Sequence, residues 1–268
     1  KTTINGQYQT LLDRIRRKHN ESIIPKNYEI KSNWTTIYQK SSEDMSEIES
    51  GTINCVITSP PYFRMKDYGT GEDQIGMEES VDKYLDNLMV NFTECYRVLR
   101  DDGSCFVNIN DCVIDGQYQA VPHKFLLRML DIGFRFNDEI LWIKTNPTYT
   151  RGPRSVRGHE PIYHFTKSDD FYYNDEWLKD LEDPQRQVSY GAGKTDPKVM
   201  SYLDYRDGIL KTNVSSTAEL RIESKEKRGF HLTHSATFPI DVPTLCALLT
   251  TREEDTILDP FCGTAVSG

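Results

Sequence analysis

A short segment, Ser59-Pro60-Pro61-Tyr62, has the residue types to hold an amino group for reaction. It follows the apolar run 54–58, which we predict to be a strand that ends at Pro-Pro, because proline cannot donate a ladder hydrogen bond. The carbonyl oxygens of Ser59 and Pro60 would then form a rigid edge rich in acceptors. Acceptors that hold both hydrogens of a nucleobase amine favour a pyramidal nitrogen, whose lone pair can attack a sulfonium methyl group in line. Tyr62 offers a ring for stacking the base, although the segment also fits a proline-stiffened turn with a surface tyrosine.

A second segment with chemical potential follows the predicted strand 256–258. It reads Asp259-Pro260-Phe261-Cys262-Gly263-Thr264, and its glycine lets the backbone approach a ligand where a side chain would block it. Ligands of open α/β sheets bind beyond the carboxyl ends of strands, which is where both segments are expected to lie. Taken alone, this second segment also fits a plain strand-to-helix turn.

Basic residues gather in one stretch of an otherwise acidic chain. The net charge is −9, so phosphate binding would have to be local rather than spread over the surface. Residues 144–157 contain no Asp or Glu, they include Tyr149, and their cations are Lys144, Arg151, Arg154 and Arg157. We interpret this stretch as a phosphate-binding loop, with a solvated loop as the alternative.

Composition narrows the class of protein. The chain has 268 residues, of which 37% are hydrophobic and 27% charged, as in a globular protein with one α/β domain and an insertion. No apolar run approaches the roughly 20 residues of a membrane span, and the first residues lack the pattern of a signal peptide, so we expect a cytoplasmic protein. The six cysteines have no metal-ligand spacing, and His231 and His234 lack partners for a metal set, so we expect no metal site.

Alternating strand and helix patterns predict a doubly wound α/β fold with a mostly parallel sheet. The polar stretch 169–228 breaks this alternation and is typical of an insertion. The predicted strands are 34–38, 54–58, 104–109, 139–144, 161–166 and 256–258, and the predicted helices are 8–19, 81–99, 121–132 and 242–250.

Several of these segments together resemble the amino-group DNA methyltransferases. Thr58-Ser59-Pro60-Pro61-Tyr62 resembles their catalytic motif, and its serine resembles the cytosine-N4 branch more than the adenine-N6 branch, where Asp or Asn is usual. The catalytic motif precedes the cofactor loop, as in a permuted branch of the family. Other segments follow in the order of that family: Lys66-Asp67-Tyr68-Gly69, Gln74-Ile75-Gly76, Tyr84-Leu85, Tyr96-Arg97-Val98-Leu99, Asp102-Gly103-Ser104, Trp142-Ile143-Lys144-Thr145-Asn146-Pro147 and Phe165-Thr166-Lys167-Ser168.

The resemblance implies transfer of a methyl group from S-adenosylmethionine to N4 of a cytosine flipped out of double-stranded DNA. Ser59, Pro60, Pro61 and Tyr62 would be the catalytic residues. The expected cofactor-binding residues are Asp259, Pro260, Phe261, Cys262, Gly263, Thr264, His234, Thr237, Phe238 and Pro239. The family loop usually has a glycine where Ala265 stands. The resemblance also implies an acidic residue for the cofactor ribose on a further helix and strand; either these lie beyond Gly268 or another segment supplies the function.

The same resemblance suggests how the chain is divided. We expect an N-terminal peripheral helix region at 1–30 and the catalytic part of the methyltransferase domain at 31–168. A target-recognition insertion is expected at 169–230, and the cofactor-loop part at 231–268. A cognate restriction endonuclease is an expected partner.

Other functions remain open from the sequence. Adenine-N6 methylation uses the same geometry, RNA could replace DNA as the substrate, and a non-catalytic DNA-binding module is the alternative outside enzymes. Methylation of cytosine C5 is disfavoured, because that chemistry uses a nucleophilic cysteine after a proline and the chain contains no Pro-Cys pair.

Overall fold

The computed structural model describes most of the methyltransferase-like part of the chain. The described residues are 35–38, 40–65, 74–144, 147, 153–174, 182–183, 188–190, 194–196, 200–201, 209–212, 238–239 and 241–262. The predicted helix 8–19 lies outside them. Residues 35–38 have no regular structure, so the predicted strand 34–38 is wrong for the part that is described. No helix among these residues has the length and apolar character that a membrane crossing requires.

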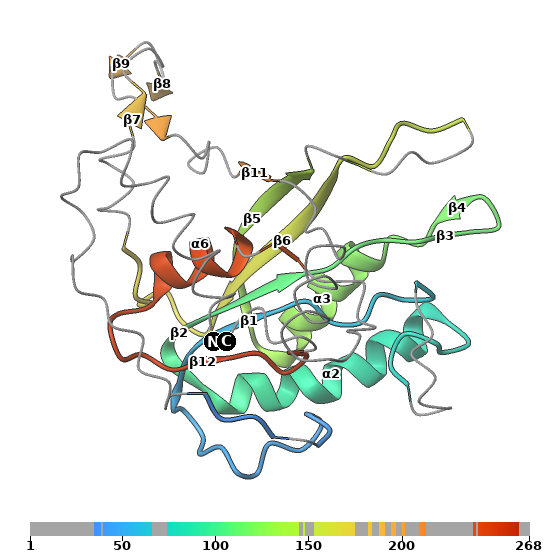
Figure 1. Cartoon of the computed structure of the whole chain (residues 1–268), viewed down its shortest axis with the longest axis horizontal. Coiled ribbons are helices and arrows are strands. Elements are labelled where there is room, and N and C mark those ends of the chain that lie inside the picture. Colours follow the sequence, from blue (N-terminus) through green and yellow to red (C-terminus); the bar gives the residue numbers. More distant parts are fainter. Residues whose placement is uncertain are drawn as a thin grey trace, which may run out of the picture.

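A six-stranded mixed sheet forms the centre of the fold (Figure 1). Its order is β11-β5-β6-β2-β1-β12, and all its strands run in one direction except β6, which is antiparallel to both of its neighbours. This confirms the predicted fold class of a mostly parallel sheet. The bounds are β1 Ile53–Thr58, β2 Leu99–Asn108, β5 Arg135–Lys144, β6 His159–Thr166, β11 Ile209–Thr212 and β12 Ile257–Leu258.

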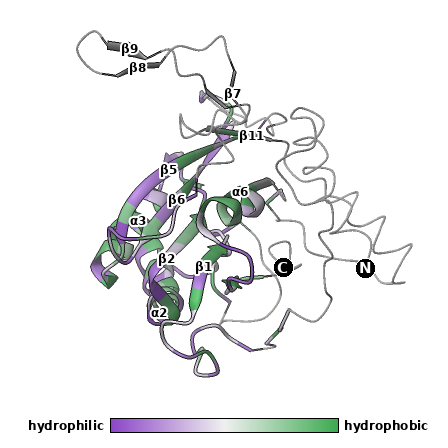
Figure 2. Cartoon of the chain, turned by 90° about the vertical axis from the view of Figure 1, so that its left-hand side faces the viewer, coloured by the Kyte–Doolittle hydropathy of each residue, from purple (hydrophilic) through white to green (hydrophobic). Residues whose placement is uncertain are grey.

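Helices cover both faces of this sheet. They are α2 (Val81–Val98) and α3 (Val121–Ile132) on one face, and α6 (Asp241–Thr250) on the other (Figures 1 and 2). Alternate residues of β1 point to the two layers, because Val56 packs with α2 and α3 whereas Cys55 and Ile57 pack with α6. A strand buried on both faces explains why this segment reads as a continuous apolar run.

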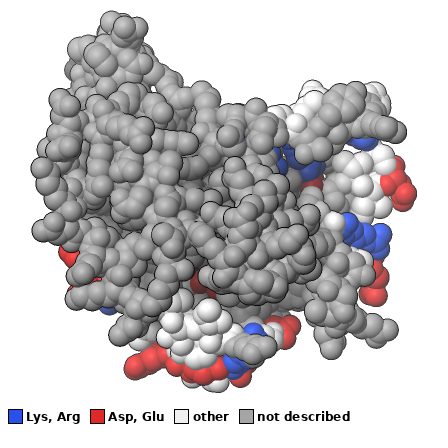
Figure 3. All heavy atoms as spheres, in the orientation of Figure 1, with Lys and Arg blue, Asp and Glu red and all other residues white. Residues whose placement is uncertain are grey.

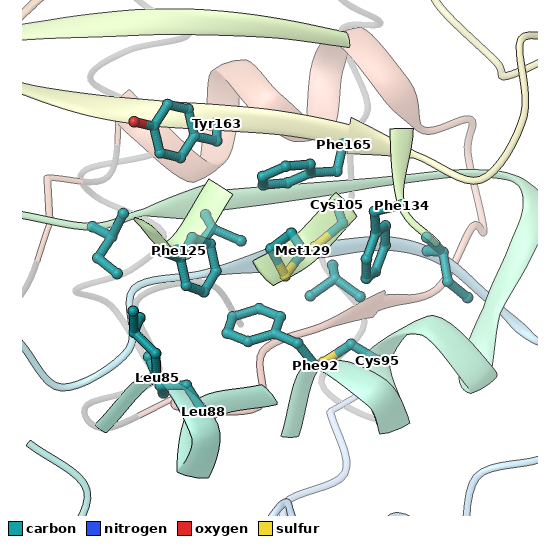
Figure 4. Packing of buried hydrophobic residues seen from close by; sticks show 14 of the residues in the cluster. Leu85, Leu88, Phe92, Cys95, Cys105, Phe125, Met129, Phe134, Tyr163 and Phe165 are labelled. Carbon is teal, nitrogen blue, oxygen red and sulfur yellow. The ribbon is translucent and has the colours of Figure 1, made fainter. Parts of the chain in front are cut away.

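Local sequence determines where α2 begins and ends. Ser80 caps its first turn by accepting a hydrogen bond from the Lys83 amide at 3.2 Å. The apolar residues at helical spacing form its buried face, and Phe92 from this face meets the Phe125 ring of α3 at 5.0 Å (Figure 4). The helix ends at Val98 rather than at the predicted Leu99, which already belongs to β2.

Three further features of the fold differ from the sequence prediction. The sequence predicted strand β6 but not that it runs antiparallel to its neighbours. A hairpin of β3 (Val113–Ile114) and β4 (Gln117–Tyr118) was missed, although Asp115-Gly116 has the positive φ values, 49° and 78°, that favour such a turn. Strand β11 was also missed; it lies within the predicted insertion yet pairs with β5 in the main sheet.

Four short strands follow β6 and precede β11. They are β7 (Glu182–Asp183), β8 (Val188–Tyr190), β9 (Lys194–Asp196) and β10 (Met200–Ser201), and they pair as β7 with β10 and β8 with β9. Both pairs are antiparallel and lie outside the six-stranded sheet.

A fully buried histidine lies in β6. The His164 ring stacks on Phe106 with centroids 4.2 Å apart, and its nitrogens lie 3.0 Å from Ser104 Oγ and 3.0 Å from Asn137 Nδ2. Burial lowers the pKa of His164 from its ordinary 6.5 to about 3, because the charged ring would lose its hydration. The folded protein therefore keeps this ring neutral under conditions in which the unfolded chain protonates it.

We predict that His164 makes the fold sensitive to acid. Between pH 6.5 and about 3 the unfolded state binds one more proton at this residue, so stability falls as pH falls, by about 1.4 kcal/mol per pH unit once well below 6.5. Urea unfolding at about pH 7 and about pH 5 should show a weaker pH dependence in His164→Gln than in the wild type. The exposed His159 of the same strand is the control, and His159→Gln should follow the wild type. Equal slopes in the wild type and His164→Gln would contradict the assignment.

Candidate active site

The two chemically promising segments meet at one edge of the sheet. β1, β2 and β12 are parallel, so their carboxyl ends lie together. Thr58, the last residue of β1, donates its hydroxyl to Asp259 Oδ1 at 2.6 Å, across a separation of 201 positions in the sequence. The Phe261 amide donates to the same oxygen at 3.0 Å. The structure therefore brings the Ser59 to Tyr62 segment beside the start of the predicted cofactor loop.

A cluster of polar side chains surrounds the Tyr62 hydroxyl. Tyr62 Oη lies 2.8 Å from Asn108 Oδ1 and 2.9 Å from Glu160 Oε2, and it accepts a hydrogen bond from Ser59 Oγ at 3.2 Å. Burial, followed by the charge of Glu160, raises the pKa of Tyr62 well above its ordinary value. The hydroxyl therefore keeps its proton.

Glu160 is the buried charge at the centre of this cluster. It is only 4% exposed, and it forms an ion pair with Lys144 from the end of β5. Asn110 Nδ2 donates to its Oε1 at 2.8 Å, and Arg157 donates in turn to Asn110 Oδ1 at 2.7 Å. A buried carboxylate is tolerated when it is paired and hydrogen bonded, and both conditions hold here.

The sequence prediction missed Asn108, Asn110 and Glu160. The two asparagines stand at the carboxyl end of β2 and just after it, so the strand-end rule that selected Ser59 could have found them. Glu160 lies near the start of β6 and reaches this edge only because β6 runs in the opposite direction. Nothing in the hydrophobic pattern discloses that direction.

A residue of α2 holds the backbone of the predicted catalytic segment, residues 59–62. Tyr84, which is fully buried in that helix, donates its hydroxyl to the Pro61 carbonyl at 2.8 Å. Gly76 has a φ of 103°, and a Cβ there would lie 3.1 Å from the Tyr62 carbonyl oxygen, so glycine permits this close approach. Among the described residues, no backbone or side-chain donor contacts the Pro60 carbonyl.

The predicted cofactor-binding residues are described in part. Asp259, Pro260 and Phe261 are half-buried at the end of β12, and Cys262 is exposed. Phe238 is buried in the cluster beneath α6, and the Pro239 carbonyl accepts from the Val242 amide at 3.0 Å. His234, Thr237, Gly263 and Thr264 lie outside the described residues. Three or more side chains that could share a metal ion are not found together in the described part of the chain.

The predicted phosphate-binding residues contact the β3–β4 hairpin. Arg154 donates to the Gly116 carbonyl and Arg157 to the Asp111 carbonyl, and their guanidinium groups lie 5.8 Å and 4.5 Å from the Tyr118 ring. Lys144 points instead into the Glu160 cluster, and Arg151 lies outside the described residues. On the described part of the face drawn in Figure 3, basic atoms lie among acidic and uncharged ones.

Comparison with known proteins finds a family and several relatives. A model of the N6_N4_Mtase family, described as DNA methylase, matches residues 53–266. The type II methyltransferase M.Cfr9I of Citrobacter freundii is 28% identical over 255 residues, which span 84% of this chain and 75% of that protein. M.XycI of Xanthomonas campestris pv. cyanopsidis is 29% identical over 255 residues, with the same coverage of 84% and 75%.

Solved structures share the fold. The cytosine-N4-specific PvuII DNA methyltransferase superposes with a TM-score of 0.62 at 21% identity, covering 86% of this chain and 75% of that one. TTHA0409 of Thermus thermophilus, complexed with S-adenosyl-L-methionine, gives a TM-score of 0.50 at 17% identity, covering 83% of this chain and 77% of that one. The family match extends from the first strand of the sheet through the predicted cofactor loop, and this chain belongs to the N6_N4_Mtase family of DNA methylases.

Proposed function

We propose that this DNA methyltransferase transfers a methyl group from S-adenosylmethionine to N4 of a cytosine in double-stranded DNA. The observation that carries the proposal is the hydrogen bond from Thr58 to Asp259, because it joins the amine-binding segment to the expected cofactor loop. S-adenosylmethionine supplies a methyl group activated on a sulfonium. These residues fit the cofactor by charge, because the half-buried carboxylate of Asp259 would attract the positive charge of the sulfonium.

The described residues would have separate roles in cofactor binding and in binding the amine. Asp259, Pro260, Phe261 and Cys262 would hold the cofactor, together with predicted residues that lie outside the described part. Ser59 Oγ and the Pro60 carbonyl accept the two amine hydrogens, which frees the nitrogen lone pair for attack. Because Ser59 is half-buried and Pro60 is buried, the target base must leave the helix stack to reach these acceptors.

Serine at position 59 favours cytosine over adenine as the target base. It resembles the cytosine-N4 branch of the family, and the PvuII neighbour that shares the fold is named as a cytosine-N4 enzyme. Adenine N6 is the second candidate, since its amine could occupy the same acceptors. We also propose residues 169–230 as the target-recognition region and a restriction endonuclease as a partner, because the relatives are type II methyltransferases.

Identification of the methylated nucleoside tests the proposal directly. Purified protein is incubated with S-adenosylmethionine and either duplex DNA or tRNA, and the nucleic acid is digested and separated by mass. We expect N4-methyldeoxycytidine from the duplex and no methylation of the tRNA. N6-methyldeoxyadenosine alone would establish the second candidate, and DNA binding without any methyl transfer would indicate a binding module.

We predict that Ser59→Ala lowers kcat by about 100-fold or more while leaving the fold intact. The side chain contacts the reacting amine in this account and lies outside the hydrophobic core, so its loss removes transition-state stabilisation without creating a core cavity. Single-turnover methylation at saturating DNA and cofactor measures the change. A variant with normal turnover would place the reaction elsewhere.

We predict that Arg154 contributes to DNA binding through phosphate. If its guanidinium neutralises one phosphate, Arg154→Gln should reduce the slope of log K against log salt concentration by about 1. Arg100→Gln is the matched control, because Arg100 is exposed and pairs with Asp102 away from the polar cluster. The same slope in both variants would assign Arg154 to the hairpin contact alone.

A further inference from the structure

We propose that the Tyr62 hydroxyl is a positioning group that makes Ser59 an obligate hydrogen-bond acceptor toward the target amine. The inference rests on the proposed function and adds how this site recognises an amine. In this inference the Tyr62 hydroxyl has a role of its own, separate from the stacking of the base on the Tyr62 ring. The argument follows the direction of each hydrogen bond, starting from the groups whose direction is fixed.

Asn108 and Glu160 present only acceptors to Tyr62. The Asn108 amide nitrogen donates to the Pro161 carbonyl at 3.1 Å, so its oxygen faces Tyr62 Oη at 2.8 Å. The second neighbour is a carboxylate oxygen, Glu160 Oε2, at 2.9 Å. Neither of these oxygens carries a proton to donate. The single proton of the Tyr62 hydroxyl is therefore committed to one of them.

Further donors keep Glu160 an acceptor. Asn110 Nδ2 donates to Oε1 at 2.8 Å, and the orientation of that amide is fixed because Arg157 and the Asp111 amide donate to its oxygen at 2.7 Å and 2.8 Å. Lys144 forms the ion pair with the same carboxylate oxygen. These donors converge on Glu160, which is 4% exposed and so lies out of contact with bulk water. Its other oxygen remains free to accept from Tyr62.

The direction of the Ser59 hydrogen bond follows. With its own proton committed, Tyr62 Oη can only accept from Ser59 Oγ, which lies 3.2 Å away. A serine hydroxyl has one proton, so only lone pairs remain on Ser59 for the substrate. An amine can donate a hydrogen bond to these lone pairs. An oxo group cannot, because it is itself an acceptor and has no hydrogen to donate. A site that hydrogen bonds one group in this way rejects an analogue that lacks it.

Tyr62→Phe separates the hydroxyl from the ring. The ring remains for stacking, but the Ser59 proton loses its acceptor and can rotate toward the amine. We expect kcat to fall by about 10- to 100-fold, as for the loss of one hydrogen bond next to a charged group, with little change in the Kd of DNA or cofactor. Tyr96→Phe is the matched control, because Tyr96 lies on α2, packs against Phe134 and takes no part in the polar cluster. It should keep wild-type turnover.

A double-mutant cycle with Ser59→Ala tests whether the hydroxyl acts through Ser59. Single-turnover rates are measured for the wild type, Ser59→Ala, Tyr62→Phe and the double variant, with urea unfolding as the check on stability. In the Ser59→Ala background, Tyr62→Phe should change the rate by less than about threefold, because the group that it positions is gone.

The possible outcomes separate this inference from the proposed function. A wild-type protein that transfers methyl groups to DNA and a strongly non-additive cycle support both. Methyl transfer with an additive cycle, or with a Tyr62→Phe rate equal to the wild type, would overturn the positioning role and leave the proposed function standing. A wild-type protein without methyl transfer under any of these conditions would overturn both.

Discussion

The proposed site depends on the pairing of β1 with β12, which allows Thr58 to hydrogen bond to Asp259. Two parallel strands, β1 and β12, pair edge to edge, so residues separated by 201 positions end side by side. The predicted catalytic segment and the predicted cofactor loop need no other element to bring them together, because parallel strands place their carboxyl ends at one edge. Helices on both faces bury β1, and the polar residues begin where this buried strand ends.

The second constraint is the buried carboxylate of Glu160. Taking a carboxylate out of water costs several kcal/mol unless it is paired, and Lys144, Asn110 and Tyr62 offset that cost. The same contacts order the cluster, since Lys144 and Asn110 both donate to one carboxylate oxygen of Glu160. Lys144, from the predicted phosphate-binding stretch, thus belongs to the cluster around Glu160. Arg154 and Arg157 instead hold the hairpin that begins just beyond Asn110.

The sequence predicted much of the fold, for identifiable reasons. Helices α2 and α3 were predicted within one residue because their apolar faces are regular, and Ser59 was selected as a candidate because it follows a buried strand. Glu160 could not be found this way, because its place depends on the reversed direction of β6. Strand β11 was missed because it is short and lies in a polar stretch, and its partner β5 is distant in sequence. The roles of the predicted site residues stay predictions.

The most direct test of the account is a crystal structure of the protein with S-adenosylmethionine. We expect the cofactor to contact the residues after β12, with Asp259 still hydrogen bonded to Thr58. We also expect its methyl group to face the acceptor edge of Ser59 and Pro60, with space between for the nitrogen of a flipped base. A cofactor bound elsewhere, or with its methyl group turned away from Ser59, would contradict the account.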